Sequence, residues 1–146
     1  METYEGLVFE KFTEDDIDKL TLIMKRAFDE DTRIHLGMES GGPPGYDNGD
    51  FMRKWYLHEG VTSFTISKDG TLIGAIALWI NENKINYLGN VFVDTIFQDK
   101  GIGLKIWQFV EQKYPDTIKW QTDTPGFSTR NHVFCEIINV VSISLK

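Results

Sequence analysis

The sequence predicts a single α/β domain with a mixed, mostly antiparallel twisted sheet and flanking helices. Three observations favour this class. Strand-like apolar runs alternate with stretches of helical periodicity, an Asp-Gly turn joins two of these runs, and a helical stretch connects two later runs. The chain has 146 residues, 41% of them hydrophobic, which is the length and apolar content of one domain with one sizeable core.

The first elements are a strand over 7–12 and a helix over 14–29. Thr13 and Asp16 have the spacing of a capping box, and apolar residues then recur every three or four positions. Residues 31–50 lose this periodicity and are rich in glycine and proline. They predict a long irregular loop, of the kind that is usually functional or mobile.

A short second helix is expected over 51–58, and strands follow it. Two β-rich runs within 61–80 are joined by Asp69-Gly70, which is a strong hairpin signal. The turn at 81–84 leads to a third run over 85–93. These three runs predict an antiparallel meander.

The last elements alternate between helix and strand. A helix is expected over 101–114, and a strand over 117–122 lies parallel to 85–93 if the crossover is right-handed, as is usual. A final helix is predicted over 131–138 and a final strand over 140–145. We find no internal repeat and no linker.

Composition excludes several functional classes. The net charge of −7 argues against nucleic-acid binding, which needs a basic surface. No apolar run reaches the roughly 20 residues of a membrane helix. A single cysteine makes no internal disulfide and fits a reducing, cytoplasmic address. His35 and His58 flank the irregular loop without metal-ligand spacing, so no metal site is expected.

The acidic residues are concentrated in one half of the chain. Residues 1–73 carry 15 Asp and Glu against 8 Lys and Arg, whereas residues 74–146 carry 7 of each. Two interpretations stay open. The acidic half faces a cationic partner, or it simply has a more heavily solvated surface.

The segment 98–103 has the composition of an anion site. Gly101 and Gly103 stand where a strand passes into a helix, so the backbone can approach a ligand and the first helical N–H groups point outward. Phosphate is the usual ligand of such a site. The alternative is that the glycines only form a tight turn. The third glycine of a dinucleotide fingerprint is replaced by Ile106, and no P-loop lysine is present.

These residues resemble the GNAT superfamily of acetyl-CoA-dependent N-acetyltransferases. Gln98-x-x-Gly101-x-Gly103 follows the strand 85–93 with that family's spacing, and residues 131–136 (NHVFCE) resemble its N-x-x-F-Y-E segment. The element order also matches the acyl-CoA N-acyltransferase fold, so the resemblance spans nearly the whole chain.

The resemblance implies a site for acetyl-CoA and an acceptor. Strands 85–93 and 117–122 would part, and the pantetheine arm would lie between them. The amine of a small molecule or peptide would enter over the first two helices and attack the thioester directly. The cofactor-binding residues implied are Val91, Phe92, Val93, Gln98, Asp99, Lys100, Gly101, Ile102, Gly103, Asn131 and Phe134.

The chain departs from the family pattern at its catalytic positions. Cys135 stands where many members have a tyrosine that protonates the leaving thiolate, and it is alternatively a small buried hydrophobe. An acyl-cysteine mechanism with His132 as base is not favoured. Residues 88–90 hold no carboxylate, so Asp123 is the expected general base, although it is alternatively a turn residue.

The C-terminal segment also differs from the family. Only one strand's length follows the final helix, so the C-terminal hairpin is expected to be shortened. A partner chain would then supply the missing strand, and a homodimer through 140–145 is one expectation.

The function expected from the sequence is acetyl transfer from acetyl-CoA to a primary amine. We expect a cationic acceptor because 29–59 holds seven carboxylates against three basic residues, with Tyr46, Trp55 and Tyr56 available for cation–π contact. The alternative is a catalytically inactive acyl-CoA-binding or interaction module of the same fold.

Overall fold

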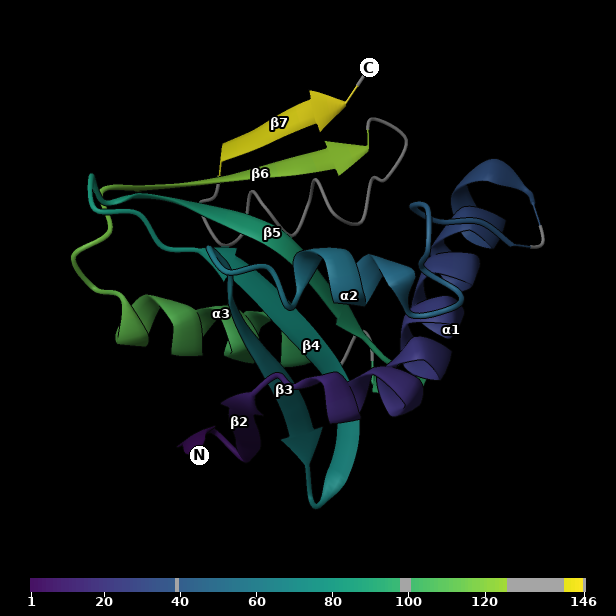
Figure 1. The fold of residues 1–146 in the computed structure, drawn as a ribbon, viewed down its shortest axis with the longest axis horizontal. Coiled ribbons are helices and arrows are strands. Elements are labelled where there is room, and N and C mark those ends of the chain that lie inside the picture. Colours follow the sequence, from purple (N-terminus) through teal and green to yellow (C-terminus); the bar gives the residue numbers. More distant parts are fainter. Residues whose placement is uncertain (39, 98–100, 126–140, 146) are drawn as a thin grey trace.

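A computed structural model describes residues 1–38, 40–97, 101–125 and 141–145 of the chain. These residues form a twisted seven-stranded sheet in which every strand lies beside its neighbour in the sequence (Figure 1). Pairs from β1 to β5 are antiparallel, and β6 is parallel to both β5 and β7. The strands are β1 Glu2–Tyr4, β2 Leu7–Lys11, β3 Thr62–Lys68, β4 Thr71–Trp79, β5 Ile85–Val93, β6 Lys119–Pro125 and β7 Val141–Leu145.

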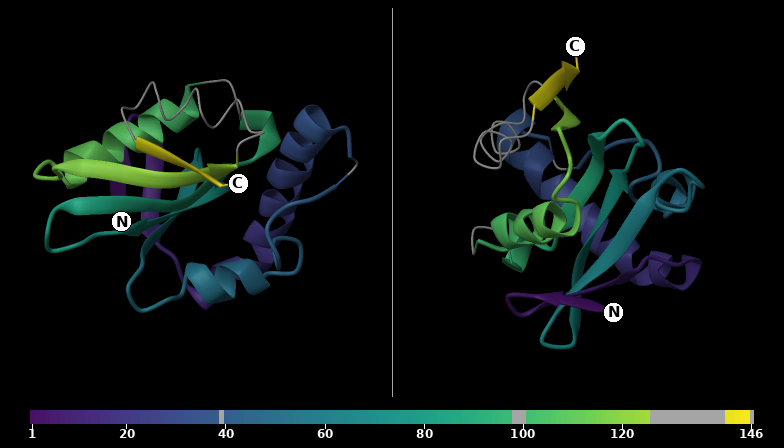
Figure 2. Two further views of the ribbon diagram at one scale, coloured as in Figure 1. Left: turned by 90° about the horizontal axis from the view of Figure 1, so that it is seen from above. Right: turned by 90° about the vertical axis from the view of Figure 1, so that its left-hand side faces the viewer.

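The helices cover both faces of the sheet. They are α1 Ile17–Leu36, α2 Asp50–Trp55 and α3 Ile102–Lys113, with 3₁₀ turns at Glu14–Asp16 and Thr95–Phe97. One core lies between the sheet and α3 and includes Trp107 and Phe109. A second core lies between the opposite face and α1 and α2, and includes Met24 and Tyr56. Figure 2 shows α3 on one side of the sheet and α1 on the other. The predicted mixed, mostly antiparallel sheet with flanking helices is confirmed.

Helix α1 is longer than the sequence pattern predicted. The predicted start at residue 14 is a 3₁₀ turn, Glu14–Asp16, and α1 itself begins at Ile17. The predicted capping box is present, since the backbone N–H and hydroxyl of Thr13 both donate to Asp16 Oδ2, at 2.8 and 3.1 Å. The expected end of α1 near residue 29 is wrong, because the helix continues to Leu36 and ends at Gly37, which has a φ of +68°. The irregular connection to α2 is therefore shorter than expected.

The meander was predicted well. Asp69 and Gly70 both have positive φ, of +51° and +80°, as a tight hairpin between right-twisted strands requires. Helix α2 ends at Trp55, earlier than the predicted residue 58. Strand β1 was not predicted, because three residues are too few to show an alternating pattern.

The C-terminal part agrees with the predicted crossover. β5 and β6 are parallel, joined through α3, and β7 is the outer strand beside β6. β6 begins at Lys119 and continues to Pro125, beyond the predicted end at residue 122. The helix predicted over 131–138 lies outside the described residues.

Candidate active site

Strands β5 and β6 pair over only part of their length. The parallel ladder ends where Leu88 lies opposite Thr122, and the hydroxyl of Thr122 donates a 2.9 Å hydrogen bond to the carbonyl oxygen of Leu88. β5 continues to Val93 and β6 to Pro125, and the two strands diverge over this stretch (Figure 1). We call this divergence, formed by residues 89–93 and 123–125, the fork.

A β-bulge marks the start of the fork. The register between β4 and β5 shifts so that Gly89 is an extra residue between Leu88 and Asn90. An extra residue reverses the alternation of side chains, and Leu88 and Val91 accordingly both pack in the core under α3. Phe92 packs with α1 and α2 on the opposite face, and Asn90 lies on that face too.

Gly74 keeps β5 close to β4 along the fork. A Cβ atom added to Gly74 would overlap the carbonyl oxygen of Phe92 and come within 3.1 Å of the Val93 Cα. Only glycine permits this close approach of two backbones. Gly74, which lies on β4 and outside the fork, therefore determines the position of the β5 side of the fork.

The connection after β5 leads into the N-terminus of α3. Gly101 precedes the helix with a φ of +74°, and its carbonyl accepts the 3.2 Å hydrogen bond of Lys105 N–H. Ile102 is buried in the core and fixes the first turn, while Gly103 leaves that turn without a side chain. The first N–H groups of α3 have no acceptor within the helix, and the positive end of the helix dipole lies at this end, which are the properties of an anion site. Gln98, Asp99 and Lys100 lie outside the described residues.

A buried aspartate ties this connection to α1. Asp94 directly follows β5, and its backbone N–H donates to the carbonyl oxygen of Ile73 at 2.7 Å. Its carboxylate accepts two hydrogen bonds from Arg26, at 2.7 Å from Nη2 and 3.3 Å from Nε. Because the guanidinium donates two hydrogen bonds to one carboxylate, the pair fixes both the distance and the orientation of α1 relative to the end of β5.

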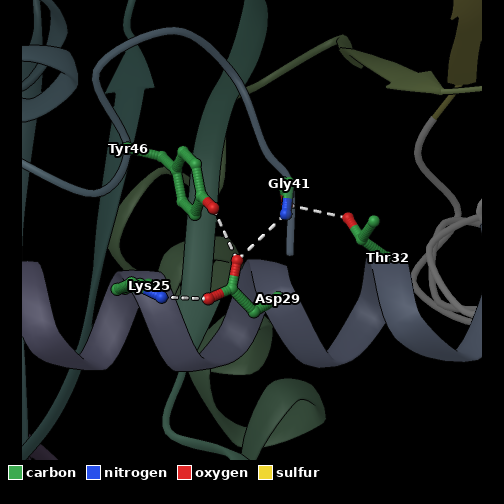
Figure 3. Close-up of polar contacts among 5 residues, drawn as sticks. All are labelled: Lys25, Asp29, Thr32, Gly41 and Tyr46. Carbon is green, nitrogen blue, oxygen red and sulfur yellow. Dashed lines mark hydrogen bonds and ion pairs between the residues drawn. The ribbon is translucent and has the colours of Figure 1, made fainter. Parts of the chain in front are cut away.

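The connection between α1 and α2 is held by Asp29. Its carboxylate accepts hydrogen bonds from Lys25 Nζ and Tyr46 Oη, both at 2.5 Å, and from the backbone N–H of Gly41 at 3.0 Å (Figure 3). Burial raises the pKa of Asp29, but these donors outweigh it and hold that pKa below its usual value. Burial and the neighbouring Asp29 raise the pKa of Tyr46 to about 12, so the phenol stays a donor.

The expected aromatic contacts to a cation are largely wrong. Tyr46 and Tyr56 are buried in the core with α1 and α2, so their ring faces are not available to a ligand. Trp55 is 39% exposed, and its ring already carries Lys54 Nζ at 4.9 Å from the ring centroid. Asp47 and Asp50 are exposed, with Asp50 paired to Arg53 at 3.2 Å.

The structure brings some of the predicted site residues together. Val91, Phe92 and Val93 lie in the fork on β5, and Gly101, Ile102 and Gly103 lie at the start of α3. The backbone of Asp123 directly follows Thr122 and pairs with Ile143, so Asp123 is a strand residue at the fork and not a turn residue. Asn131, Phe134 and Cys135 lie outside the described residues.

The described part of the chain has neither a metal-binding cluster nor a membrane-spanning helix. It contains no group of three or more His, Cys, Asp or Glu side chains that could hold a metal ion. It also contains no helix that is both long and apolar enough to span a membrane.

Comparison with known proteins decides the family. A sequence model described as the acetyltransferase (GNAT) family matches residues 23–131, which is most of the chain. The chain belongs to this family. The uncharacterized protein YrkN of Bacillus subtilis strain 168 is 29% identical over 126 residues, covering 86% of this GNAT chain and 67% of YrkN.

Solved structures show the same fold at low sequence identity. The PaiA N-acetyltransferase of Thermoplasma acidophilum, solved in complex with coenzyme A, superposes on this GNAT protein with a TM-score of 0.70 at 13% identity, covering 90% of this chain and 87% of PaiA. The Escherichia coli ribosomal-protein-S18-alanine N-acetyltransferase gives a TM-score of 0.69 at 12% identity, with coverage of 90% and 76%.

A third structure is an aminoglycoside acetyltransferase in complex with sisomicin. It comes from an uncultured soil metagenomic sample and gives a TM-score of 0.59 at 18% identity, covering 91% of this chain and 87% of that enzyme. At these identities the three structures establish the fold and nothing finer.

Sequence analysis missed three polar contacts around this site. They are the contact of Tyr56 with Asn90, the Arg26–Asp94 pair and the donors around Asp29. The signal for Asn90 was present, since it is a polar residue within the apolar strand run 85–93. No local signal connects Arg26 with Asp94, because 68 residues separate them.

Proposed function

We propose that this protein transfers the acetyl group of acetyl-CoA to a primary amine of a small, cationic molecule or peptide. The observation that carries the proposal is the fork between β5 and β6, with the N-terminus of α3 beside it, in a chain of the GNAT family. The PaiA structure supports the choice of cofactor, since that N-acetyltransferase was solved with coenzyme A.

In this proposal the fork holds the pantetheine arm as an additional strand beside Val91, Phe92 and Val93. The pyrophosphate binds the N–H groups of 98–103 at the start of α3, with Lys100 adding charge. Asn131 and Phe134 line the arm and the adenine.

The cofactor site is tested by ligand-induced stabilisation. Acetyl-CoA should raise Tm, because a ligand that binds only the native state stabilises it. Gly101→Glu and Gly103→Glu should abolish this rise, since each places a carboxylate against the pyrophosphate. Gly70→Glu is the matched control, because Gly70 also has positive φ but lies in the β3–β4 hairpin. An undiminished rise in both α3 variants would contradict the assignment.

The reaction we propose is direct attack within a ternary complex. The amine nitrogen bonds to the thioester carbon, the carbon–sulfur bond breaks, and CoA leaves as a thiolate that is then protonated. Asp123, or water that it orients, accepts the proton released by the amine. Cys135 is the proposed donor to the thiolate, although a thiol is a weak donor.

These catalytic roles predict graded losses of activity. Asp123→Asn should lower kcat by about 10²-fold with little change in acetyl-CoA affinity, as loss of a general base does. Cys135→Ser should be milder, and Cys135→Ala should retain measurable turnover. Full activity of Asp123→Asn would place the base elsewhere.

The second candidate is an inactive acyl-CoA-binding module. It is favoured by the absence of a carboxylate at 88–90 and by Cys135 in place of tyrosine. A thiol-release assay against a panel of amines separates the two. An enzyme releases CoA thiol with at least one amine, whereas a binding module shows the Tm rise without release.

A further inference from the structure

An amide side chain is held in the fork by a buried phenol. Asn90 lies on β5 one residue beyond the bulge, on the face that carries α1 and α2. Tyr56 follows α2, and its hydroxyl donates a 2.5 Å hydrogen bond to Asn90 Oδ1. The two residues are 34 positions apart in the sequence, so this contact exists only in the folded chain.

Tyr56 is itself fixed by its surroundings. It is 1% exposed, and its ring packs against those of Phe12 and Phe92, with centroids 5.0 and 6.1 Å away. Ser63 Oγ donates to its backbone carbonyl at 2.8 Å. Burial raises the pKa of Tyr56 well above its usual value, so the phenol keeps its proton and acts as a donor.

This donor orients the Asn90 amide. Within the described part of the chain, the Tyr56 hydroxyl donates to no acceptor other than Asn90, so rotating the amide by 180° would leave a buried O–H unpaired. With Oδ1 directed at Tyr56, the two N–H groups of Nδ2 point away from it. No described residue accepts a hydrogen bond from Nδ2.

We propose that Asn90 is a catalytic residue whose Nδ2 donates a hydrogen bond to the carbonyl oxygen of the bound thioester. This inference rests on the proposed function. As the amine nitrogen bonds to the carbonyl carbon, the C=O electron pair moves to oxygen, and the oriented N–H stabilises that charge. The pair returns as the carbon–sulfur bond breaks, and Asn90 neither gains nor loses a proton. Tyr56 is the positioning residue.

The first test is kinetic. Asn90→Asp keeps the shape and the acceptor for Tyr56 but replaces the donor with a carboxylate oxygen, so kcat should fall by about 10²-fold or more. Asn90→Ala should show a loss of similar size. Tyr56→Phe should lower kcat in the parent but not further in the Asn90→Ala protein. Asn86→Ser is the control, because Asn86 is also a hydrogen-bonded asparagine of β5 but lies before the fork.

The second test needs no turnover. The probe is the ketone analogue of acetyl-CoA, in which a methylene replaces the sulfur, and its affinity is compared with that of CoA. The ratio is the affinity for the ketone analogue divided by the affinity for CoA. Asn90→Ala should lower this ratio by about 2- to 12-fold, which corresponds to the loss of one neutral hydrogen bond. The Asn86→Ser control should leave the ratio unchanged.

The two tests separate this inference from the proposed function. A parent protein that acetylates an amine, with an Asn90→Asp kcat within twofold of it and an unchanged affinity ratio, overturns the role of Asn90 alone. A parent without turnover on any amine, whose affinity ratio still depends on Asn90, overturns the transfer activity but keeps the carbonyl contact. If the parent has no turnover and Asn90→Ala leaves its affinity ratio unchanged, both the transfer activity and the role of Asn90 are overturned.

Discussion

Asp29 shows how a single carboxylate can order a connection that has no regular structure. The connection after α1 contains five glycines and two prolines between residues 37 and 49, so ordering it is entropically costly. Asp29 accepts one hydrogen bond from within α1 and two from the connection (Figure 3). Thr32 Oγ1 also donates a 2.7 Å hydrogen bond to the Gly41 carbonyl. These hydrogen bonds therefore add to the packing of the buried Tyr46 in holding the connection in place.

Removing the charge of Asp29 should destabilise the protein measurably. Asp29→Asn loses the ion pair with Lys25 and weakens the bonds from Tyr46 and Gly41, so we expect a loss of about 1–3 kcal/mol in the free energy of unfolding. Urea denaturation at pH 7 measures it. The control is Asp116→Asn, since the ion pair of Asp116 with Lys84 is exposed to solvent and its removal should cost clearly less.

The same substitution has a defined pH dependence. Because the pKa of Asp29 is lowered by folding, its contribution is fully present above the unfolded pKa of about 3.9 and is lost as pH falls through the lower folded pKa. The difference in unfolding free energy between parent and Asp29→Asn should therefore be constant near neutral pH and shrink below about pH 4. A difference that grew on acidification would contradict this sign.

Arg26 should matter more than its exposure suggests. Its side chain is half exposed, but its partner Asp94 is buried, so Arg26→Gln leaves a buried carboxylate short of a charged donor. We expect a loss of about 1–3 kcal/mol and a weaker affinity for acetyl-CoA, since Asp94 leads into the connection before α3. Arg33→Gln is the control, because Arg33 pairs with Glu30 on the same helix at an exposed site. Equal losses in both variants would contradict the prediction.

At the scale of elements, the fork depends on a bulge and a close backbone approach. Gly89 reverses the side-chain alternation of β5, and Gly74 lets β4 lie against the carbonyl of Phe92. Together they place Asn90 on the face of α1 and α2 while Val91 stays in the core under α3. The geometry of the site is thus determined by two glycines that carry no chemistry.

Gly74→Ala should therefore displace β5 at the fork. The new methyl group overlaps the Phe92 carbonyl, so β5 has to move away from β4, and we expect lower stability together with weaker acetyl-CoA binding. Gly60→Ala is the matched control, because its new Cβ would also come too close to a neighbour, at 2.7 Å from the Trp79 ring, but Gly60 precedes β3 and lies outside the fork. Calorimetric titration with acetyl-CoA measures the affinities. Parent-like binding by Gly74→Ala would show that the approach is not needed.

Sequence reasoning succeeded where a pattern is local and failed where a contact is distant. The meander, the β5–α3–β6 crossover and the start of α3 each follow from periodicity, turn residues or capping, which neighbouring residues determine. The end of α1 was misplaced because Asp29 was read as a helix end, whereas its side chain bonds Tyr46, 17 residues away. Tyr46 and Tyr56 were expected to contact a ligand, but both are buried in the core. Their burial results from tertiary packing, which the local sequence does not show.

At the scale of the whole molecule, the two outer strands of the sheet, β1 and β7, differ in how they are held. β1 is held beneath α3 by an ion pair between Glu2 and Lys113 at 2.9 Å. Among the described residues, β7 pairs with β6 and its other edge has no partner strand. An edge of this kind can pair with a strand of another chain. A homodimer through this edge stays a prediction, and sedimentation of the protein at several concentrations tests it.

The charge distribution of the molecule predicts its acceptor. The net charge of −7 resides in residues 1–73, which form β1 to β3, the start of β4, α1, α2 and the α1–α2 connection, whereas the half that contains the fork and α3 is neutral. Two of the acids of α1 are already paired, since Asp29 and Glu30 each contact a basic side chain of the same helix. The exposed Asp47 and the half-compensated Asp50 remain to attract a cation entering from this face.

Neutralising these two acids should weaken binding of a cationic acceptor and of nothing else. Asp47→Asn with Asp50→Asn should raise KM for a dicationic amine by about 2- to 30-fold, because each exposed ion pair contributes about 0.2–1 kcal/mol. Acetyl-CoA affinity should not change, since the proposed cofactor site lies in the neutral half. The control is Asp69→Asn with Glu82→Gln, which changes net charge equally but lies in the two hairpins of the meander. In the parent, kcat/KM for the dication should fall steeply with added salt, because screening shortens the range of the attraction. A preference for an acidic or neutral acceptor at low ionic strength would refute the assignment, since a field of this sign repels the first and does not steer the second.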